Sequence, residues 1–287
     1  MTQLQACIDG MAVWTPFWPN WEVARQALAR PSSEHQEDQP LPNAPIPLPA
    51  MLPPAERRRA PQTVSLALEV AHNAINMWGG NPAELLSVFT SGSGDTLIID
   101  DMCSTLSNNP ELISPTRFIH SIHNAPAGVW SMSTANEQAN TALSAHRCSF
   151  ANGLLEAVVQ CHTEQKPILF VGYDTKAPNA LDEALENPLP MALALIISAQ
   201  PSSATQCVFS CRLVSNQDAQ SSPQTAWAPA QMTSGLAQAW PLLGAIALAK
   251  NAPLNLTLSA HQALAIQLAF PIRTTTDSNQ VMPHERS

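Results

Sequence analysis

Charged residues are scarce in this chain of 287 residues. Asp, Glu, Lys and Arg together make up 12% of it, about half the usual share of a quarter. Basic residues are the scarcer sign, since 13 Lys and Arg stand against 22 Asp and Glu for a formal net charge of −9. A protein that tracks nucleic-acid phosphates has the opposite balance, and the short basic run Arg57–Arg59 does not supply it. The composition excludes that class and favours a surface partly covered by a partner protein.

Long apolar runs are also absent. The richest apolar segment, Leu236–Ala249, is well short of the ~20 residues that a membrane-spanning helix needs. The first residues, Met1–Gln5, lack the basic stretch and the apolar run of a secretory signal peptide. We therefore expect a cytoplasmic protein without a membrane span.

The cysteines show no dense spacing and are typical of reduced, mostly buried thiols. Cys207 and Cys211 lie close in sequence, but no second Cys or His pair flanks them, so a zinc site is disfavoured. His120 and His123 likewise lack obvious further ligands. We expect no disulfide framework, no metal and no cofactor. The six cysteines are Cys7, Cys103, Cys148, Cys161, Cys207 and Cys211.

Hydrophobic periodicity predicts an α/β fold. Thr63 is the predicted N-cap of one helix, and Gly79 with Gly80 ends it. The order of elements along the chain implies a mixed β-sheet covered by helices. Strands are predicted over residues 4–14, 85–90, 138–146, 167–173, 191–198, 206–214 and 254–268, and helices over 22–28, 63–78, 95–107, 151–162 and 235–249.

Proline-rich and polar stretches divide the chain. Residues 31–54 are rich in proline and predict a surface excursion. Residues 215–234 predict a linker, and 271–287 predict a disordered tail. The first domain is therefore predicted to span 1–214, with a helix and a strand at 235–270 that complete the fold.

Cys148 is the candidate nucleophile that the residues themselves indicate. It follows a predicted strand and precedes a predicted helix, where the helix dipole lowers the pKa of a thiol. His146, His120 and His123 are candidate bases for acyl transfer. The sequence contains no Gly-x-Ser-x-Gly, His-Glu-x-x-His, Walker or dinucleotide-binding motif, so those enzyme classes are excluded.

Three segments resemble the amino-terminal half of β-ketoacyl-acyl-carrier-protein synthases. The resemblance extends over residues 5–214 and is closest to the short ketosynthase-like proteins of aryl polyene and related type II fatty-acid-like gene clusters. It implies the thiolase-like (ketosynthase) fold, mainly its amino-terminal half. The segments are Ser87-Val-Phe-Thr-Ser-Gly-Ser-Gly-Asp95, Asp101-Met-Cys-Ser-Thr-Leu106 and Ser114-Pro-Thr-Arg-Phe-Ile-His-Ser-Ile-His-Asn-Ala-Pro-Ala-Gly128.

The resemblance implies that the chain has no catalytic residue. In active ketosynthases the nucleophile segment reads Thr-Ala-Cys-Ser-Ser-Gly-Leu, and its Gly-Leu aligns with Gly153 and Leu154. This alignment places Phe150 at the nucleophile position, with Cys148 two residues earlier. The motifs His-Gly-Thr-Gly-Thr and Gly-His, which carry the two catalytic histidines of the family, are absent from the sequence.

The resemblance therefore implies a chain-length factor, a non-catalytic subunit that forms a heterodimer with an active β-ketoacyl-ACP synthase and shapes its acyl tunnel. Acyl-carrier protein is an indirect partner. One alternative is a stand-alone cysteine acyltransferase or thioesterase that uses Cys148. Another is a homodimeric binding module for acyl-carrier protein, which the net negative charge disfavours because that partner is acidic. The expected neighbourhood of the interface and tunnel is Phe118, His120, His123, Asn124, Trp130 and Phe150.

Overall fold

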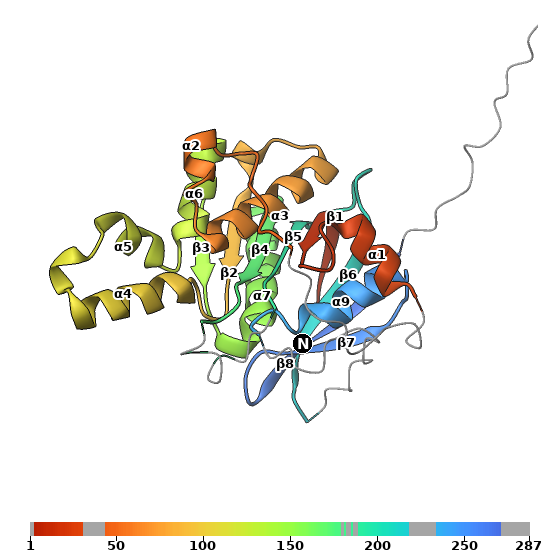
Figure 1. Ribbon diagram of the computed structural model, residues 1–287. Coiled ribbons are helices and arrows are strands. Elements are labelled where there is room, and N and C mark those ends of the chain that lie inside the picture. The colour runs from red at the N-terminus through yellow and green to blue at the C-terminus, as the bar shows by residue number, and fades with distance from the viewer. Residues whose placement is uncertain are drawn as a thin grey trace, which may run out of the picture.

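The computed structural model describes residues 3–30, 44–178, 181, 185, 189–217 and 234–270. In these ranges the chain forms a mixed eight-stranded sheet in the order β3-β2-β4-β5-β1-β6-β8-β7 (Figure 1). β2 is parallel to β3 and β4, and the other neighbours are antiparallel. The predicted mixed sheet is confirmed. The strands are β1 (Leu4–Trp14), β2 (Leu86–Thr90), β3 (Asn140–Leu143), β4 (Ile168–Asp174), β5 (Met191–Ser198), β6 (Cys207–Ser215), β7 (Pro253–Thr257) and β8 (Gln262–Ala269).

Helices cover both faces of the central strands. On β4, Ile168 and Phe170 face a core that contains α7, whereas Leu169 and Val171 face a core that contains α3. All residues of β4 are buried, as its continuous apolar run predicts. The helices are α1 (Trp21–Leu28), α2 (Pro54–Arg57), α3 (Gln62–Trp78), α4 (Thr96–Asn108), α5 (Pro115–Ser121), α6 (Ala125–Thr134), α7 (Ser149–Glu164) and α9 (Ala239–Ala247), with short 3-10 turns η2 (Pro82–Glu84), η3 (Pro110–Leu112) and η4 (His146–Cys148).

Predicted details are wrong at the start of α3 and in the last strand, and the predicted strand over 138–146 is too long, since β3 ends at Leu143 and His146 begins η4. The N-cap of α3 is Pro61, and the hydroxyl of Thr63 instead donates to Asp95 Oδ2 at 2.8 Å. The predicted strand 254–268 is a hairpin of β7 and β8. It turns at Ser259, whose Oγ accepts hydrogen bonds from the backbone N–H groups of His261 and Gln262. α3 thus begins without a side-chain cap, whereas side-chain hydrogen bonds at Ser259, which apolar spacing does not reveal, stabilise the turn between β7 and β8.

A helical arm extends beyond the edge of the sheet. It consists of α4, η3 and α5, drawn in yellow and yellow-green in Figure 1, and we call residues 96–121 the α4–α5 arm. α4 buries one residue, Thr96, and α5 buries none. The arm therefore contributes little to either hydrophobic core.

Predicted segments of low sequence complexity fall largely outside the described residues. Of the expected excursion at 31–54, residues 44–54 are described; 44–53 form no helix or strand, and Pro54 begins α2. Most of the expected linker at 215–234 and the whole expected tail at 271–287 lie outside the described ranges.

Candidate functional site

Three segments meet where the parallel strands β2 and β4 end. One is the turn Ser91–Asp95 that leads from β2 into α4, and another is the end of β4 at Asp174. The third is Ser234–Gln238, which precedes α9 and which we call the closing segment. The carboxyl ends of parallel strands are the usual place for a binding or catalytic site in an α/β sheet, so this junction is the candidate site.

The buried carboxylate of Asp174 connects the segments of this junction. Its Oδ1 accepts a hydrogen bond from Ser91 Oγ at 2.8 Å and another from the backbone N–H of Gly92 at 2.9 Å. Burial raises the pKa of Asp174 to about 6, although the contacts with Ser91, Gly92, Gly235 and His123 act in the opposite direction. Oδ2 has no hydrogen-bond partner among the described residues. The carboxylate thus links β4, the Ser91–Asp95 turn and the closing segment.

The closing segment covers the N-terminal end of α7. The backbone N–H of Phe150 donates to Gly235 O at 2.9 Å. The Gln238 side chain donates to Arg147 O at 3.2 Å and to Thr257 O at 3.0 Å. The backbones of Gly235 and Gly92 are in direct contact, since a Cβ on Gly235 would lie 2.7 Å from Gly92 Cα. Only glycine fits at such a close approach of two backbones.

Phe150, the residue at the expected nucleophile position, lies in the hydrophobic core. Its side chain has no exposed surface and packs on Phe170, with the ring centroids 5.7 Å apart. Gly153 makes room for this packing, because a Cβ there would lie 2.7 Å from Phe170 Cε2. The aromatic ring of Phe150 therefore fills the interior under α7.

Cys148 does not have the environment of an activated nucleophile. Burial raises the pKa of its thiol, and a hydrogen bond with Gln238 only partly offsets this effect. A reactive cysteine needs a lowered pKa, because the thiolate is the nucleophile. Of its candidate bases, His123 bonds Leu143 O through Nε2 at 2.9 Å, which fixes the ring against the backbone. The local electrostatics argue against the acyltransferase alternative.

The structure separates the six residues expected near an interface or tunnel. Phe118 and Asn124 are exposed, and His120 and His123 are half-buried. Trp130 is fully buried beside Phe89 in the core that contains α3, whereas Phe150 lies in the core on the other face of the sheet. Phe118 is 59% exposed, so α5, which carries it, presents a large apolar side chain to a partner.

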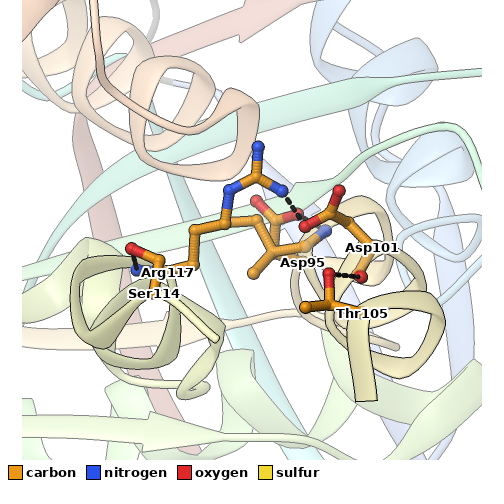
Figure 2. A network of polar contacts seen from close by, with 6 residues as sticks. Asp95, Asp101, Thr105, Ser114 and Arg117 are labelled. Carbon is orange, nitrogen blue, oxygen red and sulfur yellow. Dashed lines mark hydrogen bonds and ion pairs between the residues drawn. The ribbon is translucent and has the colours of Figure 1, made fainter. Parts of the chain in front are cut away.

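Polar contacts join the two helices of the α4–α5 arm. Figure 2 shows Arg117 reaching from α5 to form an ion pair with Asp101 on α4. Thr105 Oγ1 donates to Asp101 O at 2.9 Å, and Ser114 Oγ accepts from Arg117 N at 3.4 Å. A hollow of about 190 Å³ lies between these helices. The sequence does not predict this ion pair, because Asp101 and Arg117 are sixteen residues apart. The helix that carries Arg117, α5, is also not predicted.

Apolar side chains gather on and beside this arm. Eight of the fourteen large hydrophobic side chains that are exposed in the described residues lie between positions 97 and 132. β3, an edge strand with β2 as its neighbour in the sheet, is part of the same edge of the molecule in Figure 1. The eight are Leu97, Ile99, Leu106, Leu112, Phe118, Ile119, Ile122 and Met132.

Comparison with known proteins identifies the family. The family model described as the N-terminal domain of β-ketoacyl synthase matches residues 26–245, well over half of the chain. The chain belongs to the β-ketoacyl synthase family. No curated protein matches it.

Solved structures share the ketosynthase fold with this family member. The ketosynthase ApeO in complex with its chain length factor ApeC, from Xenorhabdus doucetiae, matches with a TM-score of 0.69 and 21% identity, over 92% of this chain and 99% of the other. The ishigamide ketosynthase/chain length factor matches with a TM-score of 0.70 and 11% identity, over 93% and 99%. A type II polyketide synthase acyl-carrier protein in complex with its ketosynthase, AntDE:AntF, gives a TM-score of 0.73 at 8% identity, over 94% and 100%. These matches confirm the predicted thiolase-like fold.

Other features of the described residues bear on the expected chemistry. Among them, no group of three or more His, Cys, Asp or Glu is arranged to hold a metal ion. No helix in the described ranges is long and apolar enough to cross a membrane. The six cysteines form no disulfide in the structure, and four of them are buried.

Proposed function

We propose that this chain is a chain-length factor, a non-catalytic ketosynthase-like subunit that pairs with an active β-ketoacyl-ACP synthase and shapes its acyl tunnel. The pathway we propose is aryl polyene or a similar type II fatty-acid-like biosynthesis in the cytoplasm. Acyl-carrier protein is reached through the partner, and this subunit needs no cofactor. The observation that carries the proposal is the apolar surface of the α4–α5 arm.

The arm has the properties of a surface that another protein covers. Phe118 and Ile119 on α5 are 59% and 60% exposed, and Leu112 on η3 is 68% exposed. Exposed apolar surface that is concentrated in one part of a protein favours an interaction site there. Aromatic and other large apolar residues form the centre of protein interfaces, while charged residues are depleted there. The low overall charge of the chain agrees with this assignment.

The fold supports a ketosynthase as the partner. Two of the matched structures are described as a ketosynthase with its chain length factor. Residues 87–128, which carry the resemblance most specifically, include the whole arm. We therefore propose that Phe118 and its neighbours in the block 114–130 lie against the ketosynthase and bound part of its tunnel.

The absence of catalysis in this subunit is supported by Phe150. The ring at the nucleophile position is buried and carries no reactive group, so the chain cannot hold an acyl group as a thioester there. We also propose that residues 1–214 form the ketosynthase-like domain and that 235–270 complete it. β8 supports this division, because it pairs with β6 from Val208 to Ser215.

Two matched variants test the role of the arm. Phe118→Glu, alone or with Ile119→Glu, puts a charge into the proposed interface and should weaken binding to the cognate ketosynthase by about tenfold or more. Leu213→Glu is the control, because Leu213 is 40% exposed on β6, several strands away from β3. Binding is measured by titration of the purified proteins. If the arm variants bind as tightly as the control, the arm is not the interface.

A further inference from the structure

The first amides of α7 are already used by the protein itself. A helix leaves its first N–H groups without partners inside the helix, and in enzymes such groups stabilise the negative oxygen of a reacting acyl group. In this chain the N–H of Ser149 donates to His146 O, and the N–H of Phe150 donates to Gly235 O at 2.9 Å. The donor at the nucleophile position therefore faces a protein carbonyl.

Tight packing holds that carbonyl in place. A Cβ on Gly235 would lie 2.7 Å from Gly92 Cα and 2.8 Å from His146 O, so the backbone there is confined on two sides. The next residue, Leu236, is fully buried and lies against Gly172 of β4. Gln238 then fastens the segment to η4 and β7 through Arg147 O and Thr257 O.

Asp174 and Ser91 anchor the turn that carries Gly92, the residue whose backbone contacts Gly235. Ser91 Oγ donates to Asp174 and also accepts the N–H of Gly94 at 2.9 Å, so the turn that carries Gly92 is anchored to β4. Ser149 Oγ lies 2.7 Å from His146 O and 3.2 Å from Ser91 O, so its single hydroxyl proton is shared between η4 and this turn at the start of α7. The turn, the closing segment and the helix end thus form one connected set of contacts.

We propose that the closing segment Ser234–Gln238 is a built-in block on the N-terminal end of α7. It keeps the amide of residue 150 bonded to Gly235 O and excludes an acyl group from that position, whatever the side chain at 150. The chain is then unable to carry an acyl group for two reasons. Position 150 has no nucleophilic side chain, and its amide is already hydrogen-bonded to Gly235 O. The inference rests on the proposed function for the placement of Phe150, but its test does not involve pairing.

A thiol introduced at position 150 tests the block. Phe150→Cys is made in the full chain with Cys103→Ser and Cys148→Ser, which remove the two cysteines that are not buried. The probes are iodoacetamide and the hexanoyl thioester of N-acetylcysteamine. Intact mass spectrometry counts the groups added to this variant and to the same protein with Phe150. One additional group on the variant reports labelling at position 150. The expected result is no addition in the folded protein. Reaction of the introduced thiol at the rate of a free exposed thiol overturns the proposal.

Opening the block should restore reactivity. Adding Gly235→Ala forces the closing segment away from Gly92 and His146, and we expect the rate of labelling at position 150 to rise about tenfold or more. Gly128→Ala is the control, since a Cβ at Gly128 meets no atom within 4 Å. If Gly235→Ala does not fold, Gln238→Ala loosens the same segment and replaces it. A folded variant of either kind that stays unreactive shows that the closing segment is not the block.

Discussion

The junction at α7 and the α4–α5 arm are opposite cases in one molecule. At the junction, Asp174 Oδ1 accepts hydrogen bonds from Ser91 and Gly92, the backbones of Gly92 and Gly235 are in contact, and the amides of Ser149 and Phe150 at the start of α7 have partners within the chain. On the arm, large apolar side chains such as Phe118 and Ile119 are in solvent, although folding normally buries such groups. In the account proposed here, the end of α7 that carries Phe150 is closed by the chain itself, whereas the apolar surface of the arm is exposed.

This difference indicates where the molecule interacts. A buried junction contributes to the stability of the chain, so changes there should affect unfolding. An uncovered apolar arm contributes little to the stability of the chain, so changes there should affect binding. The following variants test that separation.

Two phenylalanines give the largest contrast. Phe150→Ala removes a fully buried ring that packs on Phe170, and it should lower the free energy of unfolding by about 3–5 kcal/mol. Phe118→Ala removes a ring that is 59% exposed and should change it by less than about 0.5 kcal/mol. Urea denaturation of the two variants checks this. Equal losses of stability would mean that the arm is part of the folded core.

Asp174 should make stability depend on pH. Its pKa is raised by burial from 3.8 to about 6, so the folded state binds the proton more tightly than the unfolded state does. The free energy of unfolding should therefore fall as pH rises from about 4 to about 6, by on the order of 3 kcal/mol, and the loss should persist at higher pH.

Asp174→Asn isolates this effect, because the amide keeps an acceptor for Ser91 and Gly92 but does not ionise in this range. Urea denaturation at several pH values should show the wild type losing stability relative to the variant between about pH 4 and pH 6. Parallel curves for the two proteins would contradict a buried carboxylate with a raised pKa.

The smallest effect is expected on the arm. Asp101→Asn removes the ion pair with Arg117, in which both side chains are about half exposed. Exposed ion pairs contribute about 0.2–1 kcal/mol, so the shift in the melting temperature should be slight. Asp100→Asn on the same helix serves as the control. A loss of several kcal/mol in Asp101→Asn alone would show that the arm is a stabilising part of the chain.

The sequence predicts well the elements that are buried. β5 spans the predicted residues 191–198, and the apolar run of β4 is the strand expected between two covered faces. The helices α5 and α6 were not predicted, and α6 is an exception to the success with buried elements, because it buries Ala125, Pro126, Ala127 and Trp130. α5 has no buried residue, and its apolar side chains point to solvent, so the hydrophobic periodicity that reveals a packed helix is absent there.

The junction could be predicted only in part. The Ser91–Asp95 turn and the buried strand before Asp174 follow from local patterns. The contact between Gly92 and Gly235 does not, because it joins residues far apart in the chain and neither spacing nor composition marks it. For the same reason Gln238, whose side chain fastens the closing segment, carries no signal in the sequence.

Pairing of this chain with an active ketosynthase is the property on which the proposed function depends. Size-exclusion chromatography with light scattering, on the chain alone and co-expressed with the cognate β-ketoacyl-ACP synthase, tests it most directly. A stable one-to-one complex, with poor solubility of the chain alone, is the predicted result. A well-behaved chain that elutes apart from the ketosynthase and leaves its product length unchanged would contradict the account.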